Sequence, residues 1–458
     1  MKPSVFPLLM IVLLASSQTL LVLASSYTVD DDVISTATQY NSQRKLARTS
    51  DGTLHTVFNK YNGSSNQIYY AYSIDNGLNW ICEQISYPQV DYPQYYPSIA
   101  VDSMDNIHIV WEGFGWNSYP SRVNLLYRMK SETGWQETEK ITDMDDYSYD
   151  ASIAVDSMDN IHVVWIGTGY GDNTGYYNIQ YRMRNTSGWQ PRENLTDIEC
   201  EQFEPAIAID THDNIHVVWY GCGWGNNPSS DNIQYKMRTE TGWQNQESVT
   251  DSSYSQTYPS IAVDSLDNIH VVWEGYGSTH SLNSNIKYRV KTETGWNQLE
   301  NITDIDADQN YPSIALDSQD NIHVVWHGEN WGSNPDANNI QYRLRTDMGW
   351  QTQVGLTDQA YNQMYPSCIW AMWPDPPLVR TDVPETGFAL VYTSQVDDQV
   401  YDLAFYASED LTWGEKISDI IVGGELTFDM SFIIRILYVI LELLLISSPL
   451  IFSRRTRY

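Results

Sequence analysis

One segment recurs along this 458-residue chain and decides what the chain can fold into. It reads YPSIAVDSMDNIHIVW at residues 96–111 and returns every 53 or 54 residues. The close copies end at Trp165, Trp219, Trp273 and Trp326, and weaker copies end at Phe58 and Tyr392. A repeat of about 40–50 residues made of short alternating runs is typical of a propeller, a solenoid or an array. Seven copies that fill most of the chain indicate one closed domain rather than three ordinary domains.

Each repeat predicts four short strands. In the third unit these are residues 152–155, 161–165, 178–184 and a fourth strand ending near Asp197. The runs are rich in Val, Ile, Tyr and Trp and are separated by turn residues, without a helical period. The second strand, IHVVW, is apolar almost throughout, as expected where neighbouring blades cover both faces of a sheet. We therefore expect an all-β, seven-bladed propeller of four-stranded antiparallel blades over residues 43–420.

The turn before the fourth strand carries a family signature. Residues 73–80 read Ser-Ile-Asp-Asn-Gly-Leu-Asn-Trp, which matches Ser-x-Asp-x-Gly-x-x-Trp, and later units keep a shortened form. The seven units end at Trp80, Trp135, Trp189, Trp243, Trp296, Trp350 and Trp413. In this turn the chain resembles the sialidase-like propellers, whose blades carry the Asp-box or bacterial neuraminidase repeat. The resemblance implies the fold, with the box as a structural turn away from the active site, more firmly than any activity.

Sialidase activity requires groups that do not repeat. The resemblance implies three arginines for the substrate carboxylate, a tyrosine nucleophile with a supporting glutamate, and an aspartate acid/base. Arg44 stands roughly where the first of these arginines sits, but Lys-Leu-Ala follows it and no matching second and third arginines stand out. We therefore favour binding, to a glycan or a cell-surface protein, over the alternative of an exo-sialidase or other glycoside hydrolase on the same scaffold.

The loops between the second and third strands share one face with the connections between blades. Both sets of segments carry aromatic rings, and Asp150 and Glu204 take the place of a tyrosine in two of the connections. Flat rings beside amide and acid groups suit sugars, and the same chemistry suits a protein partner; the alternative is that the rings pack on one another. The candidate binding residues at this mouth are Arg44, Tyr96, Trp116, Tyr170, Trp224, Tyr258, Tyr311, Trp331 and Tyr365.

Six histidines occupy one position of the repeat. Equivalent residues of different blades stand far apart around a ring, so we expect structural histidines, each hydrogen-bonded within its blade, rather than a metal site. The basic pairs of the third strands, such as Arg182 with Arg184, repeat in the same way and receive the same structural interpretation. The six histidines are His55, His108, His162, His216, His270 and His323.

One acidic loop is a candidate calcium site. Asp304, Asp306 and Asp308 alternate along the chain, as in a run of calcium ligands, but the glycine and the distal glutamate of an EF-hand are missing. The alternative is a solvated acidic turn. No other cofactor is indicated.

The net charge and the cysteines of the chain limit the ligand classes and the disulfide pattern that it can have. The formal net charge of −33 excludes a protein that tracks nucleic-acid phosphates, which needs clustered Lys and Arg. Four cysteines are too few for a disulfide scaffold, and none has zinc-site spacing. If the compartment is oxidising, Cys200 and Cys222 are the pair to test, because both fall in loops expected on one face.

The two ends of the chain predict export and a membrane anchor. Residues 1–26 have the charged start, apolar run and small-residue exit of a signal peptide, and residues 27–42 form a lead-in. After a linker over 421–431, residues 432–453 are long and apolar enough to span a bilayer. The arginines of the tail, 454–458, place the C-terminus inside, so we expect a single-pass protein with its propeller at the cell surface.

Truncation after Gly424 is expected to release a folded, soluble propeller into the medium, because the repeat is complete before that point and no core strand is lost. Secretion and circular dichroism of the truncated chain check this. Aggregation of the truncated chain, with the full chain soluble without detergent, would show instead that the tail belongs to the fold.

Overall fold

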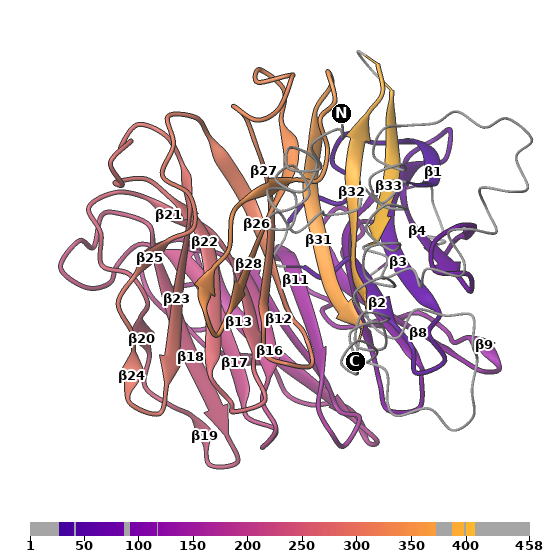
Figure 1. The fold of residues 1–458 in the computed structure, drawn as a ribbon. Helices are drawn as coiled ribbons and strands as arrows, with labels where there is room; N and C mark the ends of the chain where they lie inside the picture. The colour runs from indigo at the N-terminus through magenta and orange to yellow at the C-terminus, as the bar shows by residue number, and fades with distance from the viewer. Residues whose placement is uncertain are drawn as a thin grey trace, which may run out of the picture. The chain divides into compact units, whose positions relative to one another are not determined.

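The computed structural model describes residues 27–40, 43–86, 92–116, 118–371, 387–397 and 400–407. These residues form strands and loops only, arranged as seven antiparallel sheets (Figure 1). Each innermost strand contacts the innermost strand of the next sheet, and β31 contacts β2, so the sheets close into a ring. The predicted seven-bladed propeller is confirmed.

The strands follow the same order in every blade. The innermost strands are β2 (Leu46–Arg48), β6 (Gln94–Val101), β11 (Ser148–Val155), β16 (Gln202–Ile209), β21 (Gln256–Val263), β26 (Gln309–Leu316) and β31 (Gln363–Ala371). The second strands are β3 (Leu54–Tyr61), β7 (Ile107–Gly113), β12 (Ile161–Gly167), β17 (Ile215–Gly221), β22 (Ile269–Gly275), β27 (Ile322–Gly328) and β32 (Gly387–Gln395). The third strands are β4 (Asn66–Ser73), β8 (Asn124–Ser131), β13 (Asn178–Asn185), β18 (Asn232–Thr239), β23 (Asn285–Thr292), β28 (Asn339–Thr346) and β33 (Tyr401–Ala407).

The outermost position is the least regular. In blade one it is β5 (Ile81–Gln84), and in blades two to six it is split into two short pieces. These pieces are β9 (Gly134–Trp135) with β10 (Glu139–Lys140), β14 (Gly188–Trp189) with β15 (Glu193–Asn194), β19 (Gly242–Trp243) with β20 (Glu247–Ser248), β24 (Gly295–Trp296) with β25 (Glu300–Asn301), and β29 (Gly349–Trp350) with β30 (Val354–Gly355).

The second strands are apolar because blades stack face to face. One core cluster, for example, joins Val164 and Ile179 of the third blade to Val217 and Trp219 of the fourth. Trp219 and its equivalents in four other blades are fully buried. A fully buried aromatic or aliphatic side chain contributes about 1.5–3 kcal/mol to folding, so the interfaces between blades hold most of the apolar core.

The repeated histidines are structural, as predicted. In the third blade His162 Nε2 lies 3.0 Å from Asp156 Oδ2 and His162 Nδ1 lies 2.7 Å from the Tyr181 hydroxyl. Asp156 also accepts hydrogen bonds from the backbone and side-chain nitrogens of Asn160, both at 2.8 Å. Burial raises the pKa of the Asp156 carboxyl, but the hydrogen bonds from His162 and Asn160 outweigh it and lower the pKa to about 2. Each histidine therefore connects the turn between the first and second strands of its blade, called the first turn below, to the third strand.

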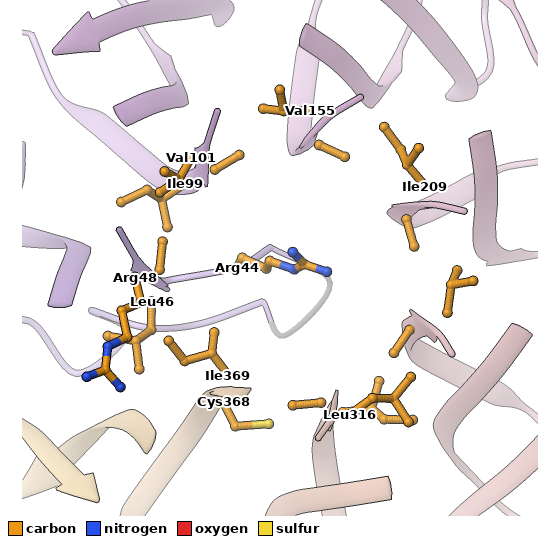
Figure 2. A pocket seen from close by; sticks show the side chains of 18 residues that line it. Arg44, Leu46, Arg48, Ile99, Val101, Val155, Ile209, Leu316, Cys368 and Ile369 are labelled. Atoms are coloured by element: carbon orange, nitrogen blue, oxygen red, sulfur yellow. The ribbon is translucent and has the colours of Figure 1, made fainter. Parts of the chain in front are cut away.

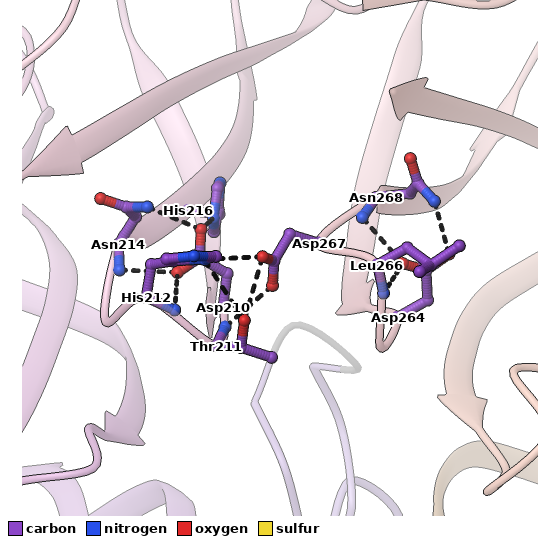
Figure 3. A network of polar contacts seen from close by, with 9 residues as sticks. All are labelled: Asp210, Thr211, His212, Asn214, His216, Asp264, Leu266, Asp267 and Asn268. Carbon is purple, nitrogen blue, oxygen red and sulfur yellow. Dashed lines mark hydrogen bonds and ion pairs between the residues drawn. The ribbon is translucent and has the colours of Figure 1, made fainter. Parts of the chain in front are cut away.

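The same turns also connect neighbouring blades. The Thr211 backbone nitrogen and hydroxyl donate to the carboxylate of Asp267 in the next blade at 2.9 and 3.0 Å (Figure 3). Asp267 has a backbone φ of 61°, which an aspartate tolerates better than most residues. Equivalent bonds join Ser50 to Asp105, Ser103 to Asp159, Ser157 to Asp213, and Ser265 to Asp320. This ladder of hydrogen bonds continues from the first blade to the sixth.

The N-terminal strand closes the ring. β1 (Tyr27–Val33) pairs antiparallel with β33 and is the outermost strand of the seventh blade, beside β32 and β31. Lys60 of the first blade bonds Asp30 of β1 at 2.6 Å. The sequence predicts a lead-in over residues 27–42 and a seventh blade that ends at Trp413; β1 lies within that lead-in, and Trp413 lies outside the described residues.

The turn at residues 73–80 shows why its glycine is needed. Gly77 has a φ of 87°, and a Cβ atom there would lie 2.1 Å from the Phe405 ring of the seventh blade. Trp80 packs edge-on against the same ring at 5.3 Å. Ser73 Oγ accepts the Gly77 N–H and Asp75 Oδ1 accepts the Asn79 N–H, at 2.8 and 2.9 Å. The turn therefore lies in the interface that closes the ring.

The segments predicted as signal peptide, linker, membrane span and tail lie outside the described residues. Within the described part of the chain there is no helix of the length and hydropathy needed to cross a bilayer.

Acid is expected to destabilise the propeller because it protonates the aspartates of the first turns. The pKa of Asp102, Asp156 and Asp264 is lowered to about 2 in the fold, against about 3.9 in an unfolded chain. A lowered carboxyl pKa stabilises the fold above the unfolded value, and this contribution is lost as the pH falls from about 4 to 2. Asp156→Asn should reduce the dependence of the unfolding free energy on pH in this range, measured by urea unfolding. Asp306→Asn, at a side chain that is 82 % exposed, should leave that dependence unchanged; equal slopes for both variants would contradict the role of the turn.

Candidate binding site at the mouth of the propeller

A β-bulge in the innermost strands forms the centre of the site. In β11 the pairing with β12 shifts register between Tyr149 and Ser152, and Asp150 at the bulge has a φ of 55°. Residues at the equivalent position have φ values between 49° and 55°. They are Tyr96, Asp150, Glu204, Tyr258, Tyr311 and Tyr365. A positive φ is strained for a tyrosine or glutamate, so the surrounding structure must hold each residue in place.

A side chain of the preceding blade holds each of four bulges. The bulge removes a backbone N–H from the sheet ladder, and this N–H needs another acceptor. Glu112 Oε2 accepts the Asp150 N–H at 2.9 Å, and Glu274 Oε2 accepts the Tyr311 N–H at 2.8 Å. Asn59 and His327 accept the N–H groups of Tyr96 and Tyr365 at 2.9 and 3.1 Å.

The acceptors share one sequence position, directly after the aromatic residue that ends the second-strand motif. From the first blade to the seventh, this position holds Asn59, Glu112, Ile166, Tyr220, Glu274, His327 and Thr393. Thr393 accepts the N–H of Thr38, so the segment after β1 completes the ring. These residues are not among the site residues predicted from the sequence. The signal for them in the sequence is that this position holds six residue types in the seven copies, whereas most of the motif is constant.

Three buried carboxyl groups gather at one side of the mouth. Glu112, Asp150 and Glu204 are all less than a tenth exposed. Burial raises the pKa of Asp150 to about 7, against the opposing effect of Lys45. Burial and the neighbouring Asp150 raise the pKa of Glu112 well above its usual value, although the Asp150 N–H and Lys45 oppose this.

Lys45 is the cation of this cluster. Its ammonium donates to Gln43 Oε1 at 2.7 Å and to the Pro97 carbonyl at 2.6 Å, and it is fully buried. Burial lowers the pKa of Lys45 to about 7, and the carboxylates of Glu204, Glu112 and Asp150 act in the opposite direction. Burial therefore raises the pKa of the acids and lowers the pKa of the amine, which brings the two toward each other.

Tyrosine rings line the rest of the mouth. The rings of Tyr258 and Tyr311 lie 4.4 Å apart, and Tyr365 meets Tyr311 edge-on at 4.9 Å. Tyr40, from the segment after β1, meets Tyr96 edge-on at 4.5 Å. All five side chains are half-buried, and burial raises their pKa values, that of Tyr96 to about 12. Their hydroxyl groups stay protonated and can donate hydrogen bonds to a ligand.

The structure separates the two sets of aromatic residues that the sequence analysis placed together. Tyr258, Tyr311 and Tyr365 converge. The loop aromatics instead pack within their own blades: Trp116 and Trp224 donate to Gln94 and Gln202 at 2.6 and 3.3 Å, Tyr170 donates to the Arg192 carbonyl at 2.9 Å, and Trp331 packs over Gly355. The aromatic residues therefore form two zones and not the single ring that was expected. The inner zone consists of the bulge residues, including the acids Asp150 and Glu204. The outer zone consists of Trp116, Tyr170, Trp224 and Trp331.

Arg44 lies apart from the mouth. It extends into the central channel among the aliphatic side chains of the innermost strands (Figure 2). Arg44, Lys45 and Arg48 are the cationic residues that the described part of the chain brings to the axis, and all three come from one stretch rather than from three blades.

The predicted calcium ligands bond to a neighbouring loop. Asp308 accepts the Ser284 N–H at 3.0 Å, Asp304 accepts the His280 N–H at 3.4 Å, and Asp306 lies 3.9 Å from the His280 ring. The group of described residues that brings three ligand atoms within 4.8 Å of one another is a different one, namely Asp210, His212 and Asp267 of the inter-blade ladder. His212 and Asp267 already bond each other at 2.8 Å.

Cys200 and Cys222 form a disulfide, with their Cα atoms 5.7 Å apart. The bond ties the connection before the fourth blade to the loop between β17 and β18, at the same face of the propeller as the mouth.

Comparison with known proteins finds similar folds but does not assign the chain to a family. No protein-family model matches the sequence, and no curated protein matches it. Among solved structures, an ulvan lyase, a polysaccharide lyase bound to -[GlcA(1-4)Rha3S]-, is similar over 86 % of this chain and 99 % of its own, with 11 % identity and a TM-score of 0.58. The NanB sialidase from Streptococcus pneumoniae matches 87 % of this chain and 72 % of its own, with 11 % identity and a TM-score of 0.44. At this identity the similarity to the lyase shows a shared propeller fold.

Replacing Lys45 by Met is expected to raise the pKa of both Asp150 and Glu112, because the cation that favours their ionised forms is lost. An infrared pH titration checks this: the band of protonated carboxyl groups should persist to higher pH, and Asp150→Asn should remove part of it. Lys60→Met, which breaks the contact with Asp30 in the outer strand, is the matched control. A band that titrates at the same pH in the Lys45 variant and the native protein would contradict the coupling.

Proposed function

We propose that this protein binds a glycan at the mouth of its propeller. The observation that carries the proposal is the inner zone, where half-buried tyrosine rings converge beside buried acids at one strained position of the repeat. Tyrosine offers a flat apolar face to a sugar ring and a hydroxyl to its polar edge. Asp150, with its pKa raised to about 7, can donate as an acid or accept as a carboxylate.

A polysaccharide is the ligand class that we favour. The similar ulvan lyase holds an acidic polysaccharide fragment, which makes uronate-containing chains the first set of ligands to test. Cells that carry glycans of this class, or a glycoprotein, would be the partners. Resemblance of the turn at residues 73–80 to the Asp-box supports a sialidase-like ancestry, and its hydrogen bonds fit the structural role that this box has.

Cell-surface placement is part of the same proposal. The expected signal peptide and C-terminal span would anchor the propeller outside the cell, and the Cys200–Cys222 disulfide supports an oxidising compartment.

Glycan cleavage is the second candidate function. One observation favours it: an acid catalyst needs a carboxyl group that stays protonated near neutral pH, and Asp150 and Glu112 are such groups. Against an exo-sialidase in particular, the cations near the axis come from one stretch of the described chain, whereas binding a sialic acid carboxylate would need three converging arginines.

A glycan array that includes uronate-rich and sialylated polysaccharides tests the proposal with the full-length protein. Tyr311→Ala should weaken binding about tenfold, because loss of one ring contact costs about 0.5–1.5 kcal/mol. Tyr311→Phe should retain most of the binding, and Trp224→Ala, in the outer zone, should change it less than about twofold. Melting temperatures of all variants control for folding.

Binding to no glycan, or equal losses in the Tyr311 and Trp224 variants, would contradict the mouth as the site. Chain shortening with new reducing ends and saturated non-reducing ends would identify a hydrolase, and shortening with an unsaturated uronate at the new non-reducing end would identify a lyase.

A further inference from the structure

The central channel contains a cavity that the mouth does not use. It has a volume of about 430 Å³ and lies where the innermost strands run into their first turns. Its wall consists of aliphatic side chains and alanines from all seven blades (Figure 2). The bulge residues of the mouth lie at the opposite ends of the same strands. The cavity therefore lies below the mouth, at the other end of the innermost strands, and has a size typical of small-molecule sites.

Arg44 is the charged group at the centre of this cavity. Its guanidinium points away from the wall into the open space (Figure 2). Among the described residues it makes no hydrogen bond or ion pair, and the one titratable group that acts on its pKa is the Cys368 thiol. Channel solvent reaches the side chain, yet the surrounding protein still lowers the pKa of Arg44.

None of the described residues supplies an anion that balances the charge of the Arg44 guanidinium. Arginine stays protonated in proteins, so the cost of partial desolvation cannot be avoided by losing a proton. Arg48, four residues later, is different, because its Nε donates to the Gly52 carbonyl at 3.0 Å. The planar fork of a guanidinium matches the two oxygens of a carboxylate.

The aliphatic side chains of the wall suit an alkyl chain, and Arg44 suits one negative charge.

We propose that the channel binds a small aliphatic monocarboxylate, with the carboxylate on Arg44 and the alkyl chain along the channel wall toward the turns. A single guanidinium neutralises one charge, so a phosphate dianion would leave an excess charge inside a chain that already carries −33. This site is independent of glycan binding at the mouth.

Titration of the full-length protein with octanoate labelled with ¹³C at the carboxyl carbon, observed by NMR in a neutral detergent, tests the proposal. The detergent alone is the blank. Octanoate should bind saturably at one site per chain, about tenfold or more tightly than acetate, which lacks the alkyl chain, or octanol, which lacks the charge. The bound carboxylate should also remain ionised to lower pH than free octanoate, because a cation stabilises its charged form.

Arg44→Met, which keeps the length of the side chain and removes the charge, should weaken octanoate binding about ten- to a hundredfold. Arg122→Met, which removes a guanidinium that lies outside the cavity and bonds the exposed Asp145 at 2.9 Å, is the matched control and should change octanoate binding less than about twofold. Ile209→Trp, at a partly buried side chain that lines the cavity, narrows it from its wall and should abolish binding while glycan binding at the mouth persists. The proposal is overturned if octanoate does not saturate, if it binds the Arg44 and Arg122 variants equally, or if inorganic phosphate competes as well as octanoate does.

Discussion

Every blade of this propeller depends on its neighbours, because the second strand of each sheet is apolar on both faces. Trp165 and Trp219, for example, belong to successive sheets, and each is buried in a cluster shared with the blade before it. A single sheet of this kind would expose two apolar faces to water, so the ring is stable only when it is complete. The polar ties between blades, such as Thr211 to Asp267, fix their relative rotation and add little apolar burial.

The same stacking explains how a strained site can exist at the axis. A bulge in an innermost strand leaves a backbone N–H without a ladder partner, and the preceding blade supplies the acceptor, as Glu112 does for Asp150. The acceptor position is free to vary between blades because it lies outside the constant motif. Variation at that position and at the bulge itself turns a seven-fold repeated frame into a mouth that combines buried acids with phenol rings.

Most of the fold could be predicted from the sequence. The repeat shows the same pattern of strands seven times, and an apolar second strand must be covered by a neighbouring blade on each face, which a closed ring of blades provides. The structural histidines followed from the same argument and are confirmed in His162 and its equivalents. Closure by β1 could not be predicted, since residues 27–33 do not resemble the fourth strands of the other blades. The burial of Lys45 and Glu112 also depends on tertiary packing, and the separation of the loop tryptophans from the axis depends on which way each side chain turns.

Because β1 pairs with β33, the two ends of the propeller can join only late in the synthesis of the chain. Thr28 meets Ala404, so the first strand to leave the ribosome has no partner until almost the whole propeller has been synthesised. Closing so long a loop is entropically costly and slow compared with forming a hairpin inside one blade. Until then the ring stays open, and the apolar faces of its first and last blades are exposed to whatever else the cell contains. The period before closure is therefore the time at which this protein most needs a chaperone.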